Sequence, residues 1–410
     1  GECSYYACMP SKALLRPGQL LAEVGRVPGV RADGLDVAAV LARRDEVIHD
    51  LDDSAQVPWL EERNVTLVRG RGRLDGEKRV RVGDDALLAR RAVVIATGSG
   101  AAMPPITGLK EALPWGNREA TTAKEPPESL VILGGGVVGV ELAQAWVSLG
   151  TRVTLVEGLS RLISREEPFA CDQVGAALRK LGVDLRMGTK AAAVSRNGQV
   201  TVELEDGTSA SGAELLVAVG RRPATDGLGL ETVGLEPGKS VEVGESLRSS
   251  SHDWLYAIGD ANGRALLTHM GKYQARLAAD AILGKQVRLV SDGLLSPRVI
   301  FTDPQVAAVG HTLASAEQAG LKVRALDVET GANAGASFIG RNASGTSRLV
   351  VDERGVIVGA TFTGVEVAES LHAATIAVVC ELRLEQLVHA VPCFPTRSEV
   401  WLKLLEADGL

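Results

Sequence analysis

The stretch of residues 130–157 constrains the fold of this chain more than any other part of its sequence. Residues 130–133 form a short apolar run, residues 134–139 read Gly-Gly-Gly-Val-Val-Gly, and residues 152–157 form a second run that ends in an acidic residue. A buried strand, a G-x-G-x-x-G turn, a helical stretch capped by Gly150 and another strand are the parts of a βαβ unit. The sequence therefore predicts a parallel sheet here, within an α/β fold.

The glycines of this turn, Gly134, Gly136 and Gly139, predict a nucleotide-binding site. Because they lack side chains, the backbone can approach a pyrophosphate at the N-terminus of the following helix, whose dipole favours anions. A glycine-rich turn without a ligand is the alternative. The position of the motif between a strand and a helix favours the nucleotide.

Glu157, at the end of the second strand, bears on the choice of nucleotide. A carboxylate at this point accepts hydrogen bonds from the ribose hydroxyls of adenosine and repels a 2′-phosphate. We therefore expect NADH rather than NADPH. Arg161 and Arg165 lie close enough in sequence to keep NADPH open.

Two cysteines near the start of the chain, Cys3 and Cys8, precede a stretch that resembles a helix with Pro10 in its first turn. Five residues of regular helix rise roughly 7.5 Å, more than the Cα separation of roughly 4.4–6.8 Å that a disulfide tolerates. A bridge would therefore force the chain out of regular helix, and a distorted bridge is easier to reduce. The helix N-terminus and Lys12 also favour a thiolate at Cys8. We interpret the pair as a working dithiol.

The composition excludes several classes of function. A net charge of -7 without a Lys/Arg block argues against a nucleic-acid partner, and no apolar run reaches the roughly 18 residues that a membrane span needs. A length of 410 residues predicts two to four domains. Having only 5 cysteines predicts a reducing, cytoplasmic setting. Their spacing does not fit a zinc half-site, so no metal site is predicted.

The segment GECSYYACMPSKALL closely resembles the active-site motif of the pyridine nucleotide–disulfide oxidoreductases, the flavoproteins that include glutathione reductase, dihydrolipoamide dehydrogenase and mercuric reductase. Three later segments resemble further motifs of this family: residues 96–98 (Ala-Thr-Gly), 215–223 with a Gly-Arg-x-Pro-like turn, and 254–260 ending in Gly-Asp. The resemblance covers essentially the whole chain.

The resemblance implies an α/β fold with two Rossmann-like nucleotide-binding domains, for FAD and NAD(P), and a C-terminal α+β dimerisation domain. The expected divisions are an FAD-binding domain at 1–115 that continues at 241–292, an NAD(P)-binding domain at 116–240 and an interface domain at 293–410. It also implies a homodimer. The family's first FAD-binding G-x-G-x-x-G is not in the sequence, so we expect the chain to be a fragment that lacks an upstream βαβ unit.

The resemblance further implies a relay of electrons from the nicotinamide through FAD to a Cys3–Cys8 disulfide. Cys8 would stay against the flavin, Cys3 would attack a small-molecule electron acceptor, and Lys12 would stand near the flavin with Glu141 as its carboxylate partner. The residues implied for FAD are Lys12, Gly98, Gly259, Asp260 and Thr268. Those implied for NAD are Gly134, Gly136, Gly139, Glu157 and Gly220.

The sequence departs from the family near its C-terminus. Disulfide reductases of the family carry His-Pro-Thr-x-x-Glu there, supplied by the second subunit, and this chain has Phe394 in the place of the histidine, with Glu399 retained. Phenylalanine cannot carry the proton that a leaving thiolate needs, and loss of such an acid–base typically costs on the order of 100- to 10,000-fold. We therefore expect a quinone, metal or other electron acceptor. We interpret His389 as structural and Cys393 as a buried spectator, with a third redox thiol as the alternative for Cys393.

Two alternatives remain open. One is a disulfide reductase like dihydrolipoamide dehydrogenase or mycothione reductase. The other is a nucleotide-binding relative that no longer catalyses electron transfer, suggested by the absent first glycine loop and the absent histidine.

The remaining patterns predict local structure only. Helices are expected at 11–24, with a break at Pro17, and at 37–63, interrupted at Pro58. Short strands are expected at 65–68, 79–82 and 91–96, and strands of the C-terminal region at 299–310 and 348–352.

Overall fold

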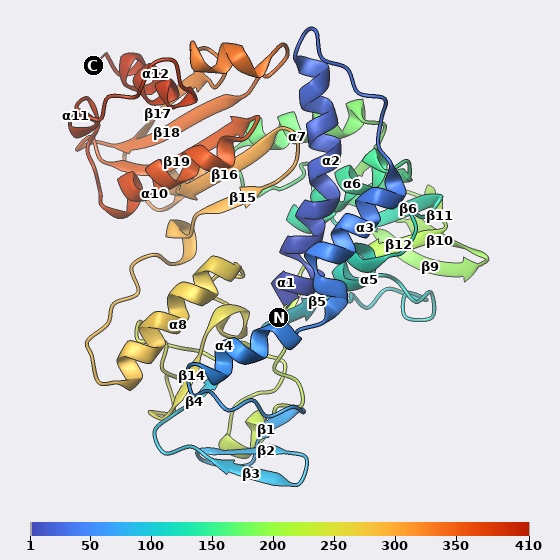
Figure 1. Cartoon of the computed structure of the whole chain (residues 1–410), viewed down its shortest axis with the longest axis vertical. Helices are drawn as coiled ribbons and strands as arrows, with labels where there is room; N and C mark the ends of the chain where they lie inside the picture. Colours follow the sequence, from blue (N-terminus) through green and yellow to red (C-terminus); the bar gives the residue numbers. More distant parts are fainter. Residues whose placement is uncertain (1, 410) are drawn as a thin grey trace.

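A computed structural model describes residues 2–409 (Figure 1). Three sheet-containing regions surround two central helices, α2 and α3. One region lies beside these helices, one below them and one, carrying the C-terminus, above and to the left in Figure 1. Within the described residues, no helix combines the length and apolarity that crossing a bilayer requires.

The region beside the central helices contains the predicted βαβ unit. Its parallel sheet has the order β12-β6-β7-β8, and Leu130, Ile132 and Leu155 of this sheet are fully buried. An antiparallel sheet, β11-β10-β9, packs next to it. The elements are β6 (Ser129–Leu133), α6 (Val137–Ser148), β7 (Arg152–Glu157), α7 (Pro168–Lys180), β8 (Asp184–Met187), β9 (Ala191–Asn197), β10 (Gln199–Leu204), β11 (Ser209–Gly212) and β12 (Glu214–Val217).

The lower region is built on a small parallel pair, β4 with β14, and on the antiparallel meander β1-β2-β3. Short strands β5 and β13 pair antiparallel and connect this region to the first. The elements are β1 (Gly72–Leu74), β2 (Arg79–Val82), β3 (Asp85–Leu88), β4 (Val93–Ile95), β5 (Ser99–Ala101), β13 (Arg221–Pro223), β14 (Leu255–Ala257) and α8 (Thr268–Ile282). The expected strands at 79–82 and 91–96 are therefore present, the second in shorter form.

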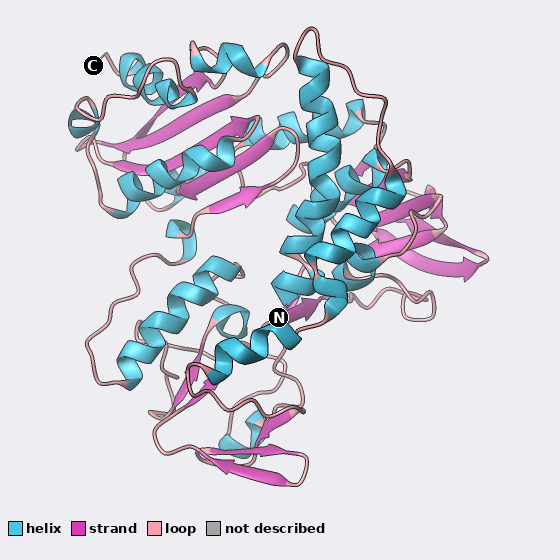
Figure 2. Cartoon of the chain, viewed as in Figure 1, coloured by secondary structure: helices cyan, strands magenta, loops and turns pink. Residues whose placement is uncertain are grey.

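The C-terminal region is an α+β unit, as expected. Its antiparallel sheet has the order β15-β16-β19-β18-β17; α10 packs on β16 and β19, and α12 on β17 and β18 (Figure 2). The elements are β15 (Arg298–Ile300), β16 (Gln305–Gly310), α9 (Leu313–Gln318), β17 (Val323–Glu329), β18 (Thr346–Asp352), β19 (Ile357–Gly364), α10 (Leu371–Val379), α11 (Leu384–Leu387) and α12 (Val400–Ala407).

The helices of the first 125 residues are α1 (Glu2–Tyr6), α2 (Cys8–Arg26), α3 (Val37–Val47), α4 (Val57–Glu61) and α5 (Asn117–Thr122). The break expected at Pro17 was wrong, because α2 runs through it. Buried Leu14 and Leu15 anchor the preceding turn, so packing outweighs the backbone donor that proline removes. Pro58 stands in the first turn of α4 rather than interrupting a helix, a position that proline tolerates well.

The strand expected at 65–68 was also wrong. Residues 61–70 are exposed throughout, and Val65 is 47% exposed. Within residues 2–409 no neighbouring strand pairs with this segment. Apolar β-branched residues favour a strand only where a partner supplies the backbone hydrogen bonds.

Candidate active site

The two cysteines lie on different helices, because the chain leaves helical geometry between them. Ala7, with φ -137° and ψ -94°, separates α1 from α2. Cys3 therefore comes before the break and Cys8 opens α2, and both are partly buried and unbridged. The Cys8 Sγ lies 3.7 Å from the hydroxyl of Thr268, the first residue of α8. The dithiol thus stands where α2 meets the lower region.

The two thiols influence each other strongly. Hydrogen bonding with Cys8 lowers the pKa of Cys3 to about 6 against the opposing effect of burial, and the Thr268 hydroxyl and the Lys12 charge act in the same direction as Cys8. The pKa of Cys8 is raised, because its hydrogen bond with Cys3 and its burial oppose ionisation. The two thiols share one hydrogen bond and ionise as a pair, so the thiolate expected at Cys8 stays a prediction. Helix position and Lys12 favoured a thiolate at Cys8, whereas the hydrogen bond between the thiols favours the negative charge on Cys3.

Lys12 and Glu141 are 129 residues apart in sequence and form an ion pair where α2 crosses α6. The Lys12 Nζ lies 2.6 Å from the Glu141 Oε2, and the two side chains are 33% and 5% exposed. The other oxygen of Glu141 accepts a hydrogen bond from the backbone N–H of Phe301, at 2.9 Å. A carboxylate this deeply buried needs both partners to offset its desolvation.

The glycine turn of the first region has the geometry that the motif requires. A Cβ on Gly139 would lie 1.9 Å from the carbonyl oxygen of Gly134, and Gly134 has a φ of +106°. Around Gly136, which precedes α6, a Cβ would meet nothing within 4 Å. Gly134 and Gly139 are therefore closed by backbone, whereas Gly136 faces open space. The turn leaves room for a ligand at the helix N-terminus.

Glu157 is held in place beside this turn. Its Oε2 accepts a hydrogen bond from the backbone N–H of Gly135 at 2.6 Å, and its Oε1 accepts one from Leu159 at 2.8 Å. Three apolar side chains around the turn are unusually exposed: Val137 (45%), Leu159 (54%) and Val219 (48%). The sequence analysis missed these three residues. Their exposure fits an adenine or nicotinamide ring lying against them.

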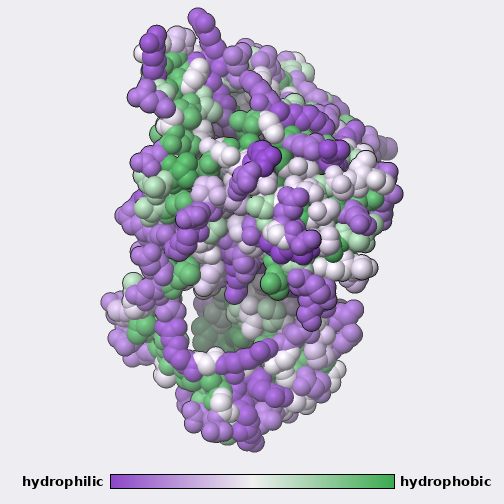
Figure 3. Space-filling view, turned by 90° about the vertical axis from the view of Figure 1, so that its right-hand side faces the viewer, coloured by the Kyte–Doolittle hydropathy of each residue, from purple (hydrophilic) through white to green (hydrophobic). Residues whose placement is uncertain are grey.

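Gly98, Gly259, Asp260 and Thr268, four of the residues expected for FAD, lie around β4, β14 and the start of α8, whereas Lys12 lies on α2. Gly98 and Gly259 have φ values of +76° and +63°, and Asp260 accepts a short hydrogen bond from the Ser99 hydroxyl. Arg221 donates to that hydroxyl at 2.6 Å. Figure 3 shows a hollow in the lower half of the molecule with hydrophobic residues on its floor.

Gln274 of α8 supports the turn at Gly259 from the interior of the region. It is fully buried, and its Oε1 accepts from the backbone N–H of Gly259 and from Asn262. Its Nε2 has no hydrogen-bond partner among the described residues, although buried donors are normally paired. Sequence reasoning missed Gln274, Ser99 and Arg221 as site residues, because their positions depend on long-range packing. Together these residues fit a polar, partly apolar cofactor such as FAD.

The C-terminal segment is not part of this cluster within one chain. Phe394 and Val391 are 78% and 80% exposed, and α12, which follows them, lies far from α1 in Figure 1. The burial expected for Cys393 was wrong, because this segment is exposed and leaves the cysteine exposed as well. Glu399 accepts a hydrogen bond from the backbone N–H of Gly335 at 3.0 Å. In this chain its carboxylate thus fixes a neighbouring loop of the same region.

Comparisons with known proteins point to one family. The sequence profile of the family described as pyridine nucleotide-disulphide oxidoreductase matches residues 1–280, and the profile of that family's dimerisation domain matches residues 296–405. Dihydrolipoyl dehydrogenase 3 of Pseudomonas aeruginosa is 32% identical, over 97% of this chain and 88% of that protein. A mercuric reductase of Staphylococcus aureus is 29% identical, over 97% of this chain and 74% of its own.

Solved structures give the same result. The HOCl-induced flavoprotein disulfide reductase RclA of Escherichia coli superposes with a TM-score of 0.87 and 25% identity, covering 99% of this chain and 91% of that one. LpdA of Mycobacterium tuberculosis superposes with a TM-score of 0.85 and 25% identity, with the same coverage.

Proposed function

The chain belongs to the pyridine nucleotide–disulfide oxidoreductase family, whose members are FAD-dependent and use NAD(P)H. On this premise we propose that it passes electrons from NADH through FAD and the Cys3–Cys8 dithiol to an acceptor other than a small disulfide. The observation that carries the proposal is the grouping of Cys3, Cys8 and Thr268 beside the Lys12–Glu141 pair. A structural role would not need two interacting thiols next to a buried ion pair.

Separate groups of residues would bind FAD, bind the dinucleotide and react with the acceptor. Lys12, Gly98, Gly259, Asp260 and Thr268 would hold FAD, which when bound supplies two-electron exchange between the nicotinamide and the thiols. The turn at 134–139, Glu157 and Gly220 would hold the dinucleotide. Cys3, whose pKa is lowered to about 6 by hydrogen bonding with Cys8, would be the thiolate that reacts with the acceptor.

The preference for NADH rests on Glu157. Its carboxylate is fixed by two backbone N–H groups, so it cannot turn away from a 2′-phosphate without losing both bonds. Repulsion between the two negative charges then disfavours NADPH. Comparing kcat/KM for the two dinucleotides checks this preference.

The acceptor is proposed from Phe394. In the homodimer that we propose for this chain, Phe394 of the partner subunit would stand near Cys3, where the family's disulfide reductases have their acid–base histidine. An apolar side chain gives no proton to a leaving thiolate, but it provides a surface for a quinone or another acceptor whose reduction releases no thiolate.

The few cysteines of the chain support a reducing, cytoplasmic setting. The domain divisions at 115, 240 and 292 remain our proposal.

The deciding experiment compares acceptors under identical conditions. NADH oxidation by the purified flavoprotein is measured with a quinone, with lipoamide and with glutathione disulfide. We expect turnover with the quinone, and disulfide turnover slower by on the order of 100-fold or more. Brisk reduction of either disulfide would contradict the proposed acceptor class.

The variant Phe394→His sharpens this experiment. It restores a titratable side chain at an exposed position, so disulfide reduction should rise by roughly tenfold or more, with quinone reduction little changed. Val391→His, at an equally exposed position three residues earlier, is the matched control and should bring no gain.

A disulfide reductase is the second candidate, favoured by the 32% identity to dihydrolipoyl dehydrogenase 3 over 97% of the chain. The acceptor comparison separates it from the first candidate. A purified protein that retained no flavin and did not oxidise NADH would instead support a catalytically silent relative.

A further inference from the structure

Phe301, in the connection between β15 and β16 of the C-terminal region, contacts both members of the Lys12–Glu141 pair. Its ring centroid lies 4.8 Å from the Lys12 Nζ, a cation–π distance. Its backbone N–H donates to the Glu141 Oε1 at 2.9 Å. One residue therefore holds the cation through its side chain and the anion through its main chain.

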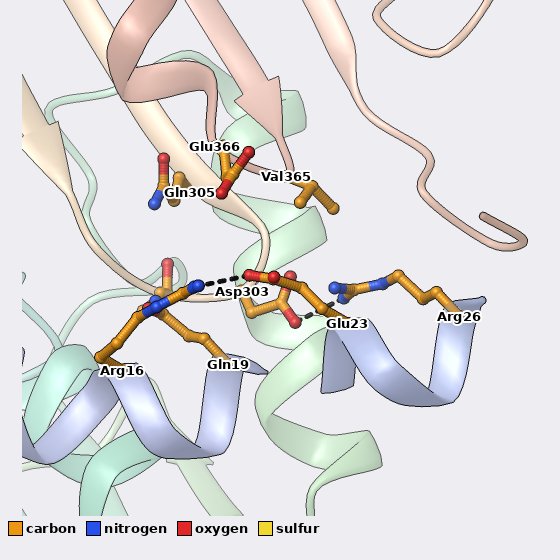
Figure 4. A pocket seen from close by; sticks show the side chains of 9 residues that line it. Arg16, Gln19, Glu23, Arg26, Asp303, Gln305, Val365 and Glu366 are labelled. Atoms are coloured by element: carbon orange, nitrogen blue, oxygen red, sulfur yellow. Dashed lines mark hydrogen bonds and ion pairs between the residues drawn. The ribbon is translucent and has the colours of Figure 1, made fainter. Parts of the chain in front are cut away.

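The connection that contains Phe301 is itself hydrogen-bonded to α2 and α6, the helices that carry Lys12 and Glu141. The Phe301 carbonyl accepts a hydrogen bond from Gln19 of α2 at 2.7 Å, and the backbone N–H of Asp303 donates to Gln144 of α6 at 2.8 Å. Asp303 also pairs with Arg26 of α2 (Figure 4). The charged residues there surround a cavity of about 20 Å³, room for one water molecule. The connection has little freedom to move away from α2 and α6.

Lys12 needs such support more than Glu141 does. Its flexible four-carbon stem loses side-chain entropy when the ammonium is held in one place, and it is 33% exposed, against 5% for Glu141. The ring of Phe301 closes one side of the ammonium with an apolar surface that carries negative charge density on its face. The ring thus restricts where the positive charge can lie.

We propose that Phe301 is a positioning residue of the dithiol site, through which the C-terminal region sets the place of the Lys12 charge relative to Cys3 and Cys8. The inference deepens the proposed function and rests on it for its catalytic meaning. The effect of Phe301 on the ionisation of the two thiols can be measured directly. The Lys12 charge favours ionisation of both Cys3 and Cys8, so a displaced ammonium weakens that effect.

The test measures thiol ionisation in the reduced, full-length flavoprotein, with Cys171, Cys380 and Cys393 replaced by serine so that only the pair reacts. The rate of alkylation by iodoacetamide is followed against pH. In Phe301→Leu the midpoint should move upward, and on its acidic side the rate should fall roughly two- to fivefold, the range of an exposed cation–π contact. Phe301→Tyr keeps an aromatic face and should match the parent.

A double-mutant cycle separates positioning from packing. Lys12→Met should shift the midpoint in the same direction, and Phe301→Leu added to Lys12→Met should bring no further shift. An unchanged midpoint in Phe301→Leu, or an equal shift with and without Lys12, would overturn the proposal. Phe301→Met provides a second non-aromatic variant if the leucine variant does not fold.

Phe362→Leu is the matched control. Phe362 is a fully buried phenylalanine of the same C-terminal region and packs edge-on against Trp401, away from Lys12. It should lower the thermal midpoint without moving the alkylation midpoint, and an equal shift in this variant would also overturn the proposal. Because alkylation needs neither NADH nor an acceptor, its outcome is independent of turnover. Failure of the proposed function would appear separately, as absent NADH oxidation by the parent protein.

Discussion

The two nucleotide-binding regions of this chain differ in how much parallel sheet supports their glycine turns. In the first region, β6 lies between β12 and β7 and is buried from Leu130 to Leu133. In the second, β4 has only β14 as a parallel partner among the described residues, and Val94 of β4 is 40% exposed. Both regions place glycines with positive φ after a strand. Gly134 and Gly139 of the first region are enclosed by backbone, whereas Gly98 and Gly259 of the second have free space around them.

This difference explains why the first site could be predicted from the sequence more directly than the second. The first has a strand, three glycines, a helix and a terminal carboxylate in one continuous segment, and physical reasoning alone predicts it. The second is assembled from three distant segments, around Lys12, around Gly98 and at residues 259–268, and only resemblance to a family pointed to it. Glycine-to-alanine substitutions can test whether the two regions also differ in how well they tolerate an added side chain.

The largest effect is expected for Gly139→Ala in the first region. The added Cβ would stand 1.9 Å from the Gly134 carbonyl oxygen, so the turn must shift, at a cost of roughly 1–3 kcal/mol in the free energy of unfolding. The shift displaces the pyrophosphate site, and NADH affinity should fall by roughly tenfold or more. Calorimetric titration with NADH and a denaturant melt measure the two effects.

Gly175→Ala is the control for that substitution. Gly175 lies inside α7 of the same region, and its Cβ would meet nothing closer than 3.5 Å. Alanine is the better helix former, so stability should rise by about 0.5–1 kcal/mol with NADH affinity unchanged. Normal NADH binding by Gly139→Ala would remove the contrast between the regions.

The next effect concerns the dithiol, where α2 meets the second region. Hydrogen bonding with Cys8 lowers the pKa of Cys3 to about 6, so Cys3 is a thiolate above that pH and becomes protonated as the pH falls through it. Alkylation of the reduced protein should therefore be nearly constant at neutral pH and fall about tenfold per pH unit below 6. A midpoint near the ordinary thiol value of about 8.5 would contradict the geometry at Cys3.

A smaller effect is expected for Gly259→Ala in the second region. Here the nearest atom to an added Cβ is the Cα of Gly271 at 3.8 Å, and the only obstacle is a φ of +63°. That conformation costs a non-glycine residue roughly 1–2 kcal/mol, so the variant should fold and retain most of its flavin. If Gly259→Ala lowered the free energy of unfolding as much as Gly139→Ala does, the second turn would be as tightly enclosed as the first.

Much of the fold, but less of the site, could be predicted from the sequence. The second strand of the βαβ unit has the predicted bounds, Arg152–Glu157, because local periodicity and flanking glycines determine it. Residues 65–68 have the same local signals but form no strand, because strand formation needs a partner. Phe301 shows the corresponding limit for the site. Its contacts join residues more than 150 positions apart, and no local pattern marks such a residue.

The central claim is that electrons from the nicotinamide reach Cys3 and Cys8, and an anaerobic NADH titration tests it most directly. The oxidised flavoprotein, with its three other cysteines replaced by serine, is titrated with NADH while flavin absorbance and accessible thiols are both followed. Each NADH supplies two electrons, so we predict that the first equivalent makes both thiols titratable and that further NADH bleaches the flavin. In Cys3→Ser the flavin should bleach with the first equivalent and no thiols should be gained. Bleaching of the parent flavin with no new thiols would contradict the claim.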